Sequence, residues 1–164
     1  YSSGSSHVLS ELVKKLTGVR ADSFAIKHLL SPIGIDEIYW PTDDQGVPLG
    51  GSGVRLTARD MARFGYLYLK GNWDGKQIVP EEWVEASQQK HMPRKYIPDS
   101  YYGYQFWVSD YGTYSAVGYQ GQWITIVPEH DLVVVFNNRL VEGDNFQWST
   151  PERLMTTYIL PAFQ

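Results

Sequence analysis

The chain has 164 residues, 43% of them hydrophobic and 15% aromatic, so it can bury a core of its own. A formal net charge of -4, with no segment rich in Lys and Arg, argues against nucleic acid as a partner. The absence of cysteine excludes disulfides and thiolate chemistry and leaves the compartment open. No run approaches the roughly 20 apolar residues of a membrane span, so none is expected.

The first half of the chain is predicted to be mostly helical. Apolar residues recur at helical spacing after the opening serines, which predicts a core-facing helix capped by Ser5 or Ser6 and ended by Gly18. A second helix is predicted to end at Leu30, before a proline. Residues 33–52 are rich in turn formers and predict a long ordered loop.

Two more helices are predicted beyond this loop. Thr57, with Asp60 three residues later, is typical of a near capping box at the start of a helix that ends at Gly71. Pro80, at a first-turn position, predicts a short helix after it. Residues 90–101 are predicted to be loop.

The hydrophobic period then changes to that of strands. Strands joined by short turns are predicted at residues 103–109, 113–117, 122–127 and 132–137. The short turns make neighbouring strands antiparallel, and Thr150-Pro151-Glu152 predicts a closing helix. The sequence therefore predicts an α+β fold with a mostly helical portion over residues 1–100 and an antiparallel sheet plus C-terminal helix over residues 101–164.

The stretch Gly118-Tyr119-Gln120-Gly121-Gln122 opens the third predicted strand. Two adjacent strands with such a glycine-relaxed entrance can hold a backbone N–H beside a reacting carbonyl. The alternative is a buried hairpin whose glycines serve only a tight bend.

Other chemistry has little support in the sequence. The histidines at positions 7, 28, 91 and 130 lack the spacing of metal ligands, so neither a metal site nor a cofactor is expected. There is no Gly-x-Ser-x-Gly elbow, and Gly50-Gly51-Ser52-Gly53 lacks the Lys-Ser/Thr sequel of a nucleotide-binding loop.

Several short motifs follow one another along the chain. They are Tyr1-Ser2-Ser3, Leu29-x-x-Pro32-Ile33-Gly34-Ile35, Gly50-Gly51-Ser52-Gly53, Leu56-Thr57-Ala58-Arg59-Asp60-Met61-Ala62-Arg63-Phe64-Gly65, Tyr102-Gly103-Tyr104-x-x-Trp107 and Gly118-Tyr119-Gln120-Gly121-Gln122. This ordered set resembles the serine β-lactamase and penicillin-binding-protein superfamily, closest to its class C-like branch of esterases, amide hydrolases and carboxypeptidases. The resemblance covers nearly the whole chain.

The resemblance implies a two-lobed enzyme with a penicillin-recognising fold. A helical lobe carries a Ser-x-x-Lys nucleophile and a Tyr-x-Asn-like motif, and an α/β lobe supplies a Lys-Thr-Gly-like strand. Residues 1–164 look like the C-terminal part of such a domain, whose partner is then the missing N-terminal segment of the same protein. An isolated chain is expected to self-associate through the surface that this segment would cover. The family resemblance also favours a periplasmic or extracellular location.

The resemblance assigns roles to individual residues. Tyr1 takes the tyrosine of Tyr-x-Asn, which passes a proton between the serine and the leaving group. Ser3 takes the Asn position and is therefore expected to bind substrate. Tyr119, Gln120 and Gly121 take the Lys-Thr-Gly position and bind substrate. The backbone N–H of Gln122 is an oxyanion donor, so the side chain of Gln122 is expected to be dispensable.

Several departures from the family pattern narrow the function. We expect the chain to lack Ser-x-x-Lys, and with it the nucleophile, and we expect no His/Asp relay to replace it. Ser3 in place of Asn weakens a β-lactam-specific assignment. Tyr119 in place of Lys removes the cation that meets a β-lactam carboxylate and favours neutral esters or amides, while Gln120 in place of a small residue narrows the cleft.

The leading hypothesis is therefore a serine hydrolase that acts on a small ester, amide or peptide through an acyl-enzyme, with residues 1–164 inactive alone. One alternative is a non-catalytic module of the same fold that binds a peptide, cell-wall or lipid-like ligand. Another is a lone α+β domain with an interaction role.

Overall fold

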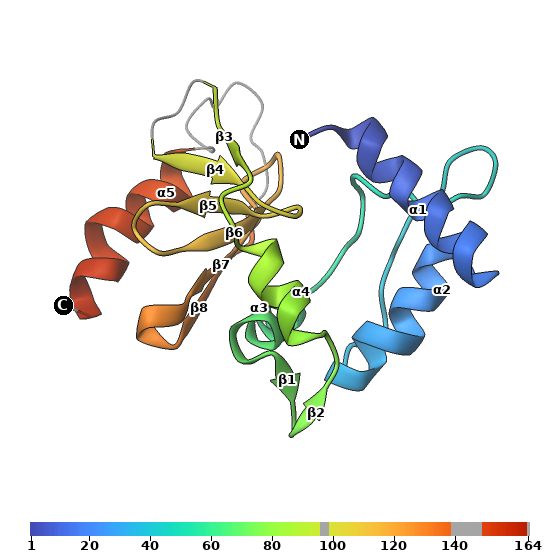
Figure 1. Ribbon diagram of the computed structural model, residues 1–164, viewed down its shortest axis with the longest axis horizontal. Coiled ribbons are helices and arrows are strands. Elements are labelled where there is room, and N and C mark those ends of the chain that lie inside the picture. The colour runs from blue at the N-terminus through green and yellow to red at the C-terminus, as the bar shows by residue number, and fades with distance from the viewer. Residues whose placement is uncertain (96–98, 139–148, 164) are drawn as a thin grey trace. The chain divides into compact units, whose positions relative to one another are not determined.

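The computed structural model describes residues 1–95, 99–138 and 149–163. The chain divides into two compact units, Tyr1–Pro80 and Glu81–Gln164. The first combines helices with a long loop and a small hairpin. Within the described residues, the second contains a six-stranded antiparallel sheet with helices before and after it (Figure 1). The predicted α+β fold is confirmed.

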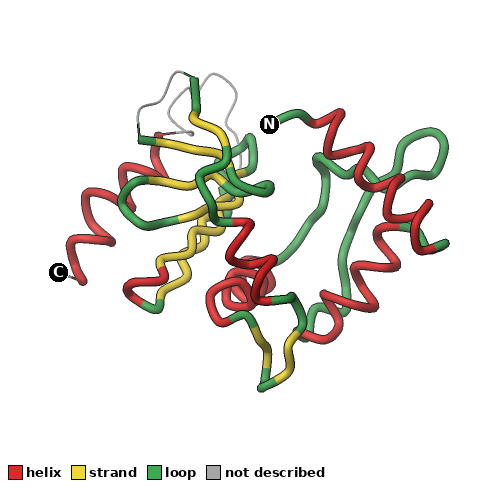
Figure 2. The backbone as a smooth tube through the Cα atoms, in the orientation of Figure 1, coloured by secondary structure: helices red, strands yellow, loops and turns green. Residues whose placement is uncertain are grey.

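The first unit is built from helices joined by a long loop. Its elements are α1 (Ser3–Thr17), α2 (Ala21–Ala25) with a following π-helical turn (Ile26–Leu30) and 3-10 turn (Ser31–Ile33), α3 (Ala58–Lys70), β1 (Asn72–Trp73) and β2 (Lys76–Gln77). The loop over residues 34–57 matches the predicted one and is drawn in green between the 3-10 turn and α3 (Figure 2).

Helix α1 begins earlier than predicted. Ser2 is its N-cap, and the Oγ of Ser2 accepts a hydrogen bond from the backbone N of Ser5 at 3.3 Å. The predicted caps Ser5 and Ser6 are therefore wrong, because both already lie inside the helix. Gly18, with φ of 73°, ends the helix in the left-handed conformation, as predicted.

Most apolar side chains of α1 face solvent rather than the core of the unit, although Val13 is half-buried. The exposed ones are Val8, Leu9, Leu12 and Leu16. Ser6 and Ser10 are buried instead. The prediction of a core-facing apolar stripe is therefore wrong for the described chain, where the helix packs through its serine face. An amphipathic helix with an exposed apolar stripe has packing capacity that its own unit does not use.

Helix α3 follows its predicted start and is tied to the preceding turn. The Oγ1 of Thr57 accepts from the backbone N of Asp60 at 3.2 Å, and the Asp60 carboxylate accepts from the backbone N of Thr57 at 3.4 Å. Arg63 donates to Asp60 at 2.9 Å and to the carbonyl of Gly34 at 2.7 Å. The capping box therefore fixes both the helix start and the arginine that holds the 3-10 turn.

The second unit carries the sheet, whose strands are neighbours in chain order. Its elements are α4 (Glu81–Ser87), β3 (Met92–Pro93), β4 (Ser100–Tyr102), β5 (Trp107–Ser109), β6 (Tyr114–Val117), β7 (Trp123–Val127), a 3-10 turn (Pro128–His130), β8 (Leu132–Phe136) and α5 (Ser149–Leu154), which continues as a π-helical turn (Met155–Ile159) and a 3-10 turn (Leu160–Phe163). The β7–β8 hairpin confirms the pairing that the sequence predicted.

The first strands of the sheet differ from the prediction. Residues 90–101, predicted to be loop, contain β3 and the start of β4. Pro93 argued against a strand in the sequence, because proline is tolerated in a sheet only on an edge strand. The structure places β3 at such an edge. Residues 103–106, predicted as strand, form a turn in which Gln105 has φ of 66°. A Cβ on Gly103 would lie 2.1 Å from the Ser87 carbonyl, so this turn passes directly against α4.

Among the residues that the structure describes, no helix is both long enough and apolar enough to cross a membrane.

The loop of the first unit passes directly against the start of α1. A Cβ on Gly50 would lie 2.1 Å from the carbonyl oxygen of Ser6, and a Cβ on Gly51 would lie 3.0 Å from that of Ser3. Backbone atoms form these contacts and cannot rotate away as a flexible side chain could. The glycines are therefore required by the close approach of loop and helix.

Gly50→Ala should destabilise the complete protein by about 1–3 kcal/mol, because the added methyl group overlaps helix backbone. Gly4→Ala is the matched control, since its Cβ would meet only the Ser2 Oγ at 3.8 Å and alanine favours helix. Denaturant unfolding of both variants measures the difference. Equal stability of the two variants would contradict the close approach of the loop to α1.

Candidate functional site

The candidate site residues lie in both units. Tyr1 and Ser3 lie at the start of α1 in the first unit. Tyr119, Gln120, Gly121 and Gln122 lie in the turn between β6 and β7 in the second. Each group has its own supporting contacts within its unit.

The phenol of Tyr1 is held by the glycine loop. Its hydroxyl donates to the carbonyl of Gly51 at 2.7 Å and accepts from the Oγ of Ser3 at 3.5 Å. Tyr1 is 61% exposed and the hydrogen bond of its hydroxyl is also exposed, so solvent and solutes can reach it. The hydroxyl is thus oriented by the loop while remaining accessible for proton transfer.

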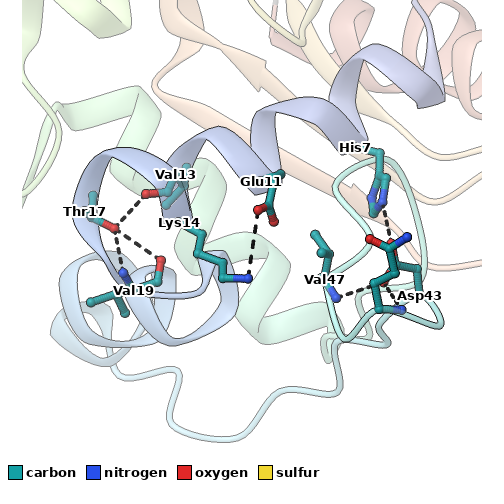
Figure 3. Close-up of polar contacts among 9 residues, drawn as sticks. His7, Glu11, Val13, Lys14, Thr17, Val19, Asp43 and Val47 are labelled. Atoms are coloured by element: carbon teal, nitrogen blue, oxygen red, sulfur yellow. Dashed lines mark hydrogen bonds and ion pairs between the residues drawn. The ribbon is translucent and has the colours of Figure 1, made fainter.

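A histidine and an aspartate that sequence reasoning did not pair support this loop. The Nε2 of His7 lies 3.0 Å from the Oδ2 of Asp43, and the backbone N of Gly50 donates to the Nδ1 of His7 at 3.4 Å (Figure 3 shows the His7–Asp43 contact). Since Nδ1 accepts a hydrogen bond, the neutral ring carries its proton on Nε2 and donates it to the carboxylate. His7 therefore joins α1 to the glycine next to the one that holds Tyr1.

Asp43 is itself fixed by its own turn. Its Oδ1 accepts from the backbone N of Gln45 and of Val47, both at 2.9 Å, as Figure 3 shows for Val47. The Val47 hydrogen bond is the largest of the contacts that hold the pKa of Asp43 below its usual value, and the His7 contact adds to it. Asp43 therefore orients the imidazole as a carboxylate.

The His7–Asp43 pair does not act on a serine in this unit. The Nδ1 that a relay would direct at a hydroxyl receives the backbone N–H of Gly50 instead. The hydroxyl of Ser6, one residue away, donates to the carbonyl of Ser2 at 3.2 Å. The pair instead stabilises the glycine loop whose Gly51 carbonyl binds the Tyr1 hydroxyl.

The candidate turn in the second unit is closed by its own backbone. Gly118 N donates to the carbonyl of Gln122 at 2.7 Å, and Gly121 N donates to the carbonyl of Gly118 at 3.1 Å. Gly121 has φ of 79°, a conformation that suits glycine. Tyr119 is 75% exposed, and Gln122 is the last turn residue before β7.

A Ser-x-x-Lys spacing does occur in the chain, contrary to the expectation that it is absent. Ser87 is followed three residues later by Lys90. Ser87 is fully buried at the end of α4, and its hydroxyl donates to the carbonyl of Trp83 at 2.6 Å. A hydroxyl that is buried and bonded to its own helix cannot reach a substrate carbonyl.

Lys90 is equally unsuited to activate a nucleophile. Its ammonium group hydrogen-bonds to the carboxylate of Asp110 and lies 4.9 Å from the ring centre of Tyr101. The hydrogen bond to Asp110 is the main cause of a raised pKa for Lys90. A lysine that retains its proton is a poor base, so Ser87 and Lys90 share the spacing of the motif without its chemistry.

The second unit also has a cavity, beside the sheet. It has a volume of about 40 Å³ and is lined by residues that include Trp107, Trp123 and Glu152. Such a volume holds water rather than an organic substrate. Across the described ranges, no group of three or more His, Asp or Glu side chains is placed to hold a metal ion.

The pKa of Asp43 is lower in the folded protein than the ordinary carboxyl pKa of about 3.9, so the ionised carboxylate stabilises the fold. This stabilisation is fully present above the ordinary pKa and is lost as the pH falls through the folded-state pKa. Asp43→Asn should therefore destabilise the complete protein at pH 5, and its difference from wild type should shrink toward pH 3. Asp44→Asn, at the exposed neighbouring position, is the control. Denaturant melts at both pH values measure this, and a difference that grows on acidification would contradict it.

Comparison with known proteins shows which family the sequence matches. The sequence profile described as Beta-lactamase matches residues 1–147. The 6-aminohexanoate-dimer hydrolase of Paenarthrobacter ureafaciens is 29% identical over 160 residues, which cover 90% of this chain and 41% of that protein. The chain thus spans less than half the length of this curated relative.

Solved structures agree with the profile. A Bacillus anthracis protein provisionally named a 6-aminohexanoate-dimer hydrolase superposes with a TM-score of 0.83 and 26% identity, over 99% of this chain and 44% of its own. A β-lactamase of Mycobacterium bovis superposes with a TM-score of 0.73 and 17% identity, over 97% of this chain and 64% of its own, which supports the fold alone. With the profile matching most of its length, the chain belongs to the Beta-lactamase family.

Proposed function

We propose that residues 1–164 form the C-terminal part of a serine hydrolase that cleaves an amide or ester bond through an acyl-enzyme. The observation that carries this proposal is the exposed Tyr1 hydroxyl, held at 2.7 Å by the Gly51 carbonyl. By resemblance, we assign Tyr1 to the family's proton-transferring tyrosine. Membership of a hydrolase family supports it.

In the proposed reaction a serine outside residues 1–164 attacks the substrate carbonyl. The hydroxyl proton of that serine passes through the Tyr1 oxygen to the leaving nitrogen or oxygen as the C–N or C–O bond breaks. Water then hydrolyses the acyl-serine ester and releases the acid. The backbone N–H of Gln122 stabilises the negative charge on the carbonyl oxygen in both steps.

The proposed substrate class is an acyclic amide or ester. Tyr119 supplies an exposed ring where the family pattern has a lysine, so the turn offers no cation to a substrate carboxylate at this position. Two relatives carry names that state the dimer of 6-aminohexanoate as substrate, and such a dimer is joined by an amide. Both observations support a short linear amide over a β-lactam.

We further propose that the segment carrying the nucleophile covers α1. The apolar side chains Val8, Leu9, Leu12 and Leu16 are exposed in this chain. The chain accounts for 41% of one relative and 44% of another, so these relatives contain enough additional sequence to cover the stripe. Burial of a stripe of this kind stabilises a helix by roughly 25 cal/mol per Å² of apolar surface.

A fluorophosphonate probe should label the complete protein at a serine outside residues 1–164. Peptide mapping by mass spectrometry locates the adduct. Ser87→Ala should leave labelling unchanged and lower stability by about 1 kcal/mol, because it removes one buried hydrogen bond. An adduct on Ser87 would overturn the assignment of the nucleophile. A complete protein that forms no adduct and turns over no ester would favour the non-catalytic binding module.

Tyr1→Phe in the complete protein should lower kcat by about 10²–10⁴-fold, since it keeps the ring and removes the oxygen that moves the proton. Tyr66→Phe removes the hydroxyl of another partly exposed tyrosine and should leave kcat unchanged. Steady-state hydrolysis of a p-nitrophenyl ester measures both. Near-normal kcat in Tyr1→Phe would show that Tyr1 is not the proton-transfer residue.

A further inference from the structure

The side chain of Gln122 is folded back onto the turn that contains it. Its Oε1 accepts a hydrogen bond from the backbone N of Gln120 at 3.2 Å. Its Nε2 donates to the backbone carbonyl of Asn138 at 2.6 Å. One side chain thus links the tip of the β6–β7 turn to the segment that follows β8.

Asn138 completes the link from the opposite side. Its Nδ2 donates to the carbonyl of Gly121 at 3.1 Å. Gln122 and Asn138 therefore make reciprocal contacts, in which each side-chain amide donates to a backbone carbonyl of the other segment. We call these two residues the turn clamp.

Gly118 makes room for the turn clamp. A Cβ at this position would lie 2.8 Å from the Oε1 of Gln122 and 3.3 Å from its Cβ. Any larger residue would push the Gln122 side chain away from the turn. The need for glycine at position 118 therefore follows from the position of the Gln122 side chain as well as from the bend of the turn.

The turn would be loose without such a link. It contains two glycines within residues 118–122, and glycine has more backbone conformational freedom to lose on ordering than any other residue. An oxyanion donor acts only when its N–H lies about 2.7–3.1 Å from the oxygen of the transition state. A donor carried by this turn needs contacts that fix its position before substrate arrives.

We propose that Gln122 and Asn138 are positioning residues that hold the β6–β7 turn ready to stabilise the oxyanion. This inference rests on the proposed function. It also replaces the expectation that the Gln122 side chain is dispensable, because truncation to Ala removes both of its hydrogen bonds while retaining the backbone N–H.

The test uses Asn138→Ala and Asn138→Asp in the complete protein. Both remove the Nδ2 donor to Gly121 and keep the Asn138 carbonyl that Gln122 binds, and the aspartate preserves the shape of the side chain. Gln122→Glu removes the opposite donor and keeps an acceptor for Gln120 N–H. Asn137→Ala is the matched control, since this exposed neighbour has the same side chain and, among the described residues, makes no side-chain hydrogen bond to the turn.

Two measurements are made on each variant at temperatures well below its unfolding transition. Hydrogen exchange of the Gly118 and Gly121 amides, which are hydrogen-bonded within the turn, reports opening of the turn directly and does not depend on activity. Steady-state hydrolysis of a p-nitrophenyl ester separates kcat from KM. Loss of a transition-state contact lowers kcat and leaves KM nearly unchanged.

In the clamp variants we expect several-fold faster amide exchange and a fall in kcat of about tenfold or more, with KM unchanged, while Asn137→Ala behaves as wild type. Unchanged exchange in all three variants would overturn the clamp. Faster exchange with normal kcat would overturn the catalytic role of the turn. The proposed hydrolase activity itself is tested separately, by the kcat of Tyr1→Phe and by the fluorophosphonate adduct. The two failures are therefore distinguishable.

Discussion

The first unit depends on the direct contact between the backbone of Gly50 and Gly51 and the first turns of α1. No side chain fits between the loop and the helix, because a Cβ on Gly50 would lie 2.1 Å from the Ser6 carbonyl. This contact brings the Gly51 carbonyl to the Tyr1 hydroxyl and the Gly50 N–H to the ring of His7. The position of Tyr1 is thus set by a loop 50 residues away in sequence.

The second unit uses glycine in a related way. Gly103 lets the chain pass against the end of α4, and Gly118 leaves the space that the Gln122 side chain occupies. In each case the absence of a side chain allows polar backbone groups to meet a partner that would otherwise be out of reach. These glycines therefore allow close approaches that position neighbouring groups, in addition to giving the backbone conformational freedom.

The sequence predicted what depends on neighbours along the chain. The Thr57–Asp60 capping box and the β7–β8 hairpin are local, and both were found where expected. The contacts that build the candidate site join distant segments: His7 and Asp43 are 36 residues apart, and Gln122 and Asn138 are 16 apart. Periodicity also showed that α1 is amphipathic but could not show which face its own unit would bury.

Ser87 and Lys90 show why spacing alone does not define a nucleophile. In the working motif a lysine must give up its proton beside an accessible hydroxyl. Here the hydroxyl donates to a helix carbonyl in the core and the lysine is paired with Asp110, which favours its charged form. Both of these hydrogen bonds are made within the second unit and support its fold. By contrast, the Tyr1 hydroxyl is oriented by one carbonyl and stays open to solvent, which is the condition a proton-transfer group must meet.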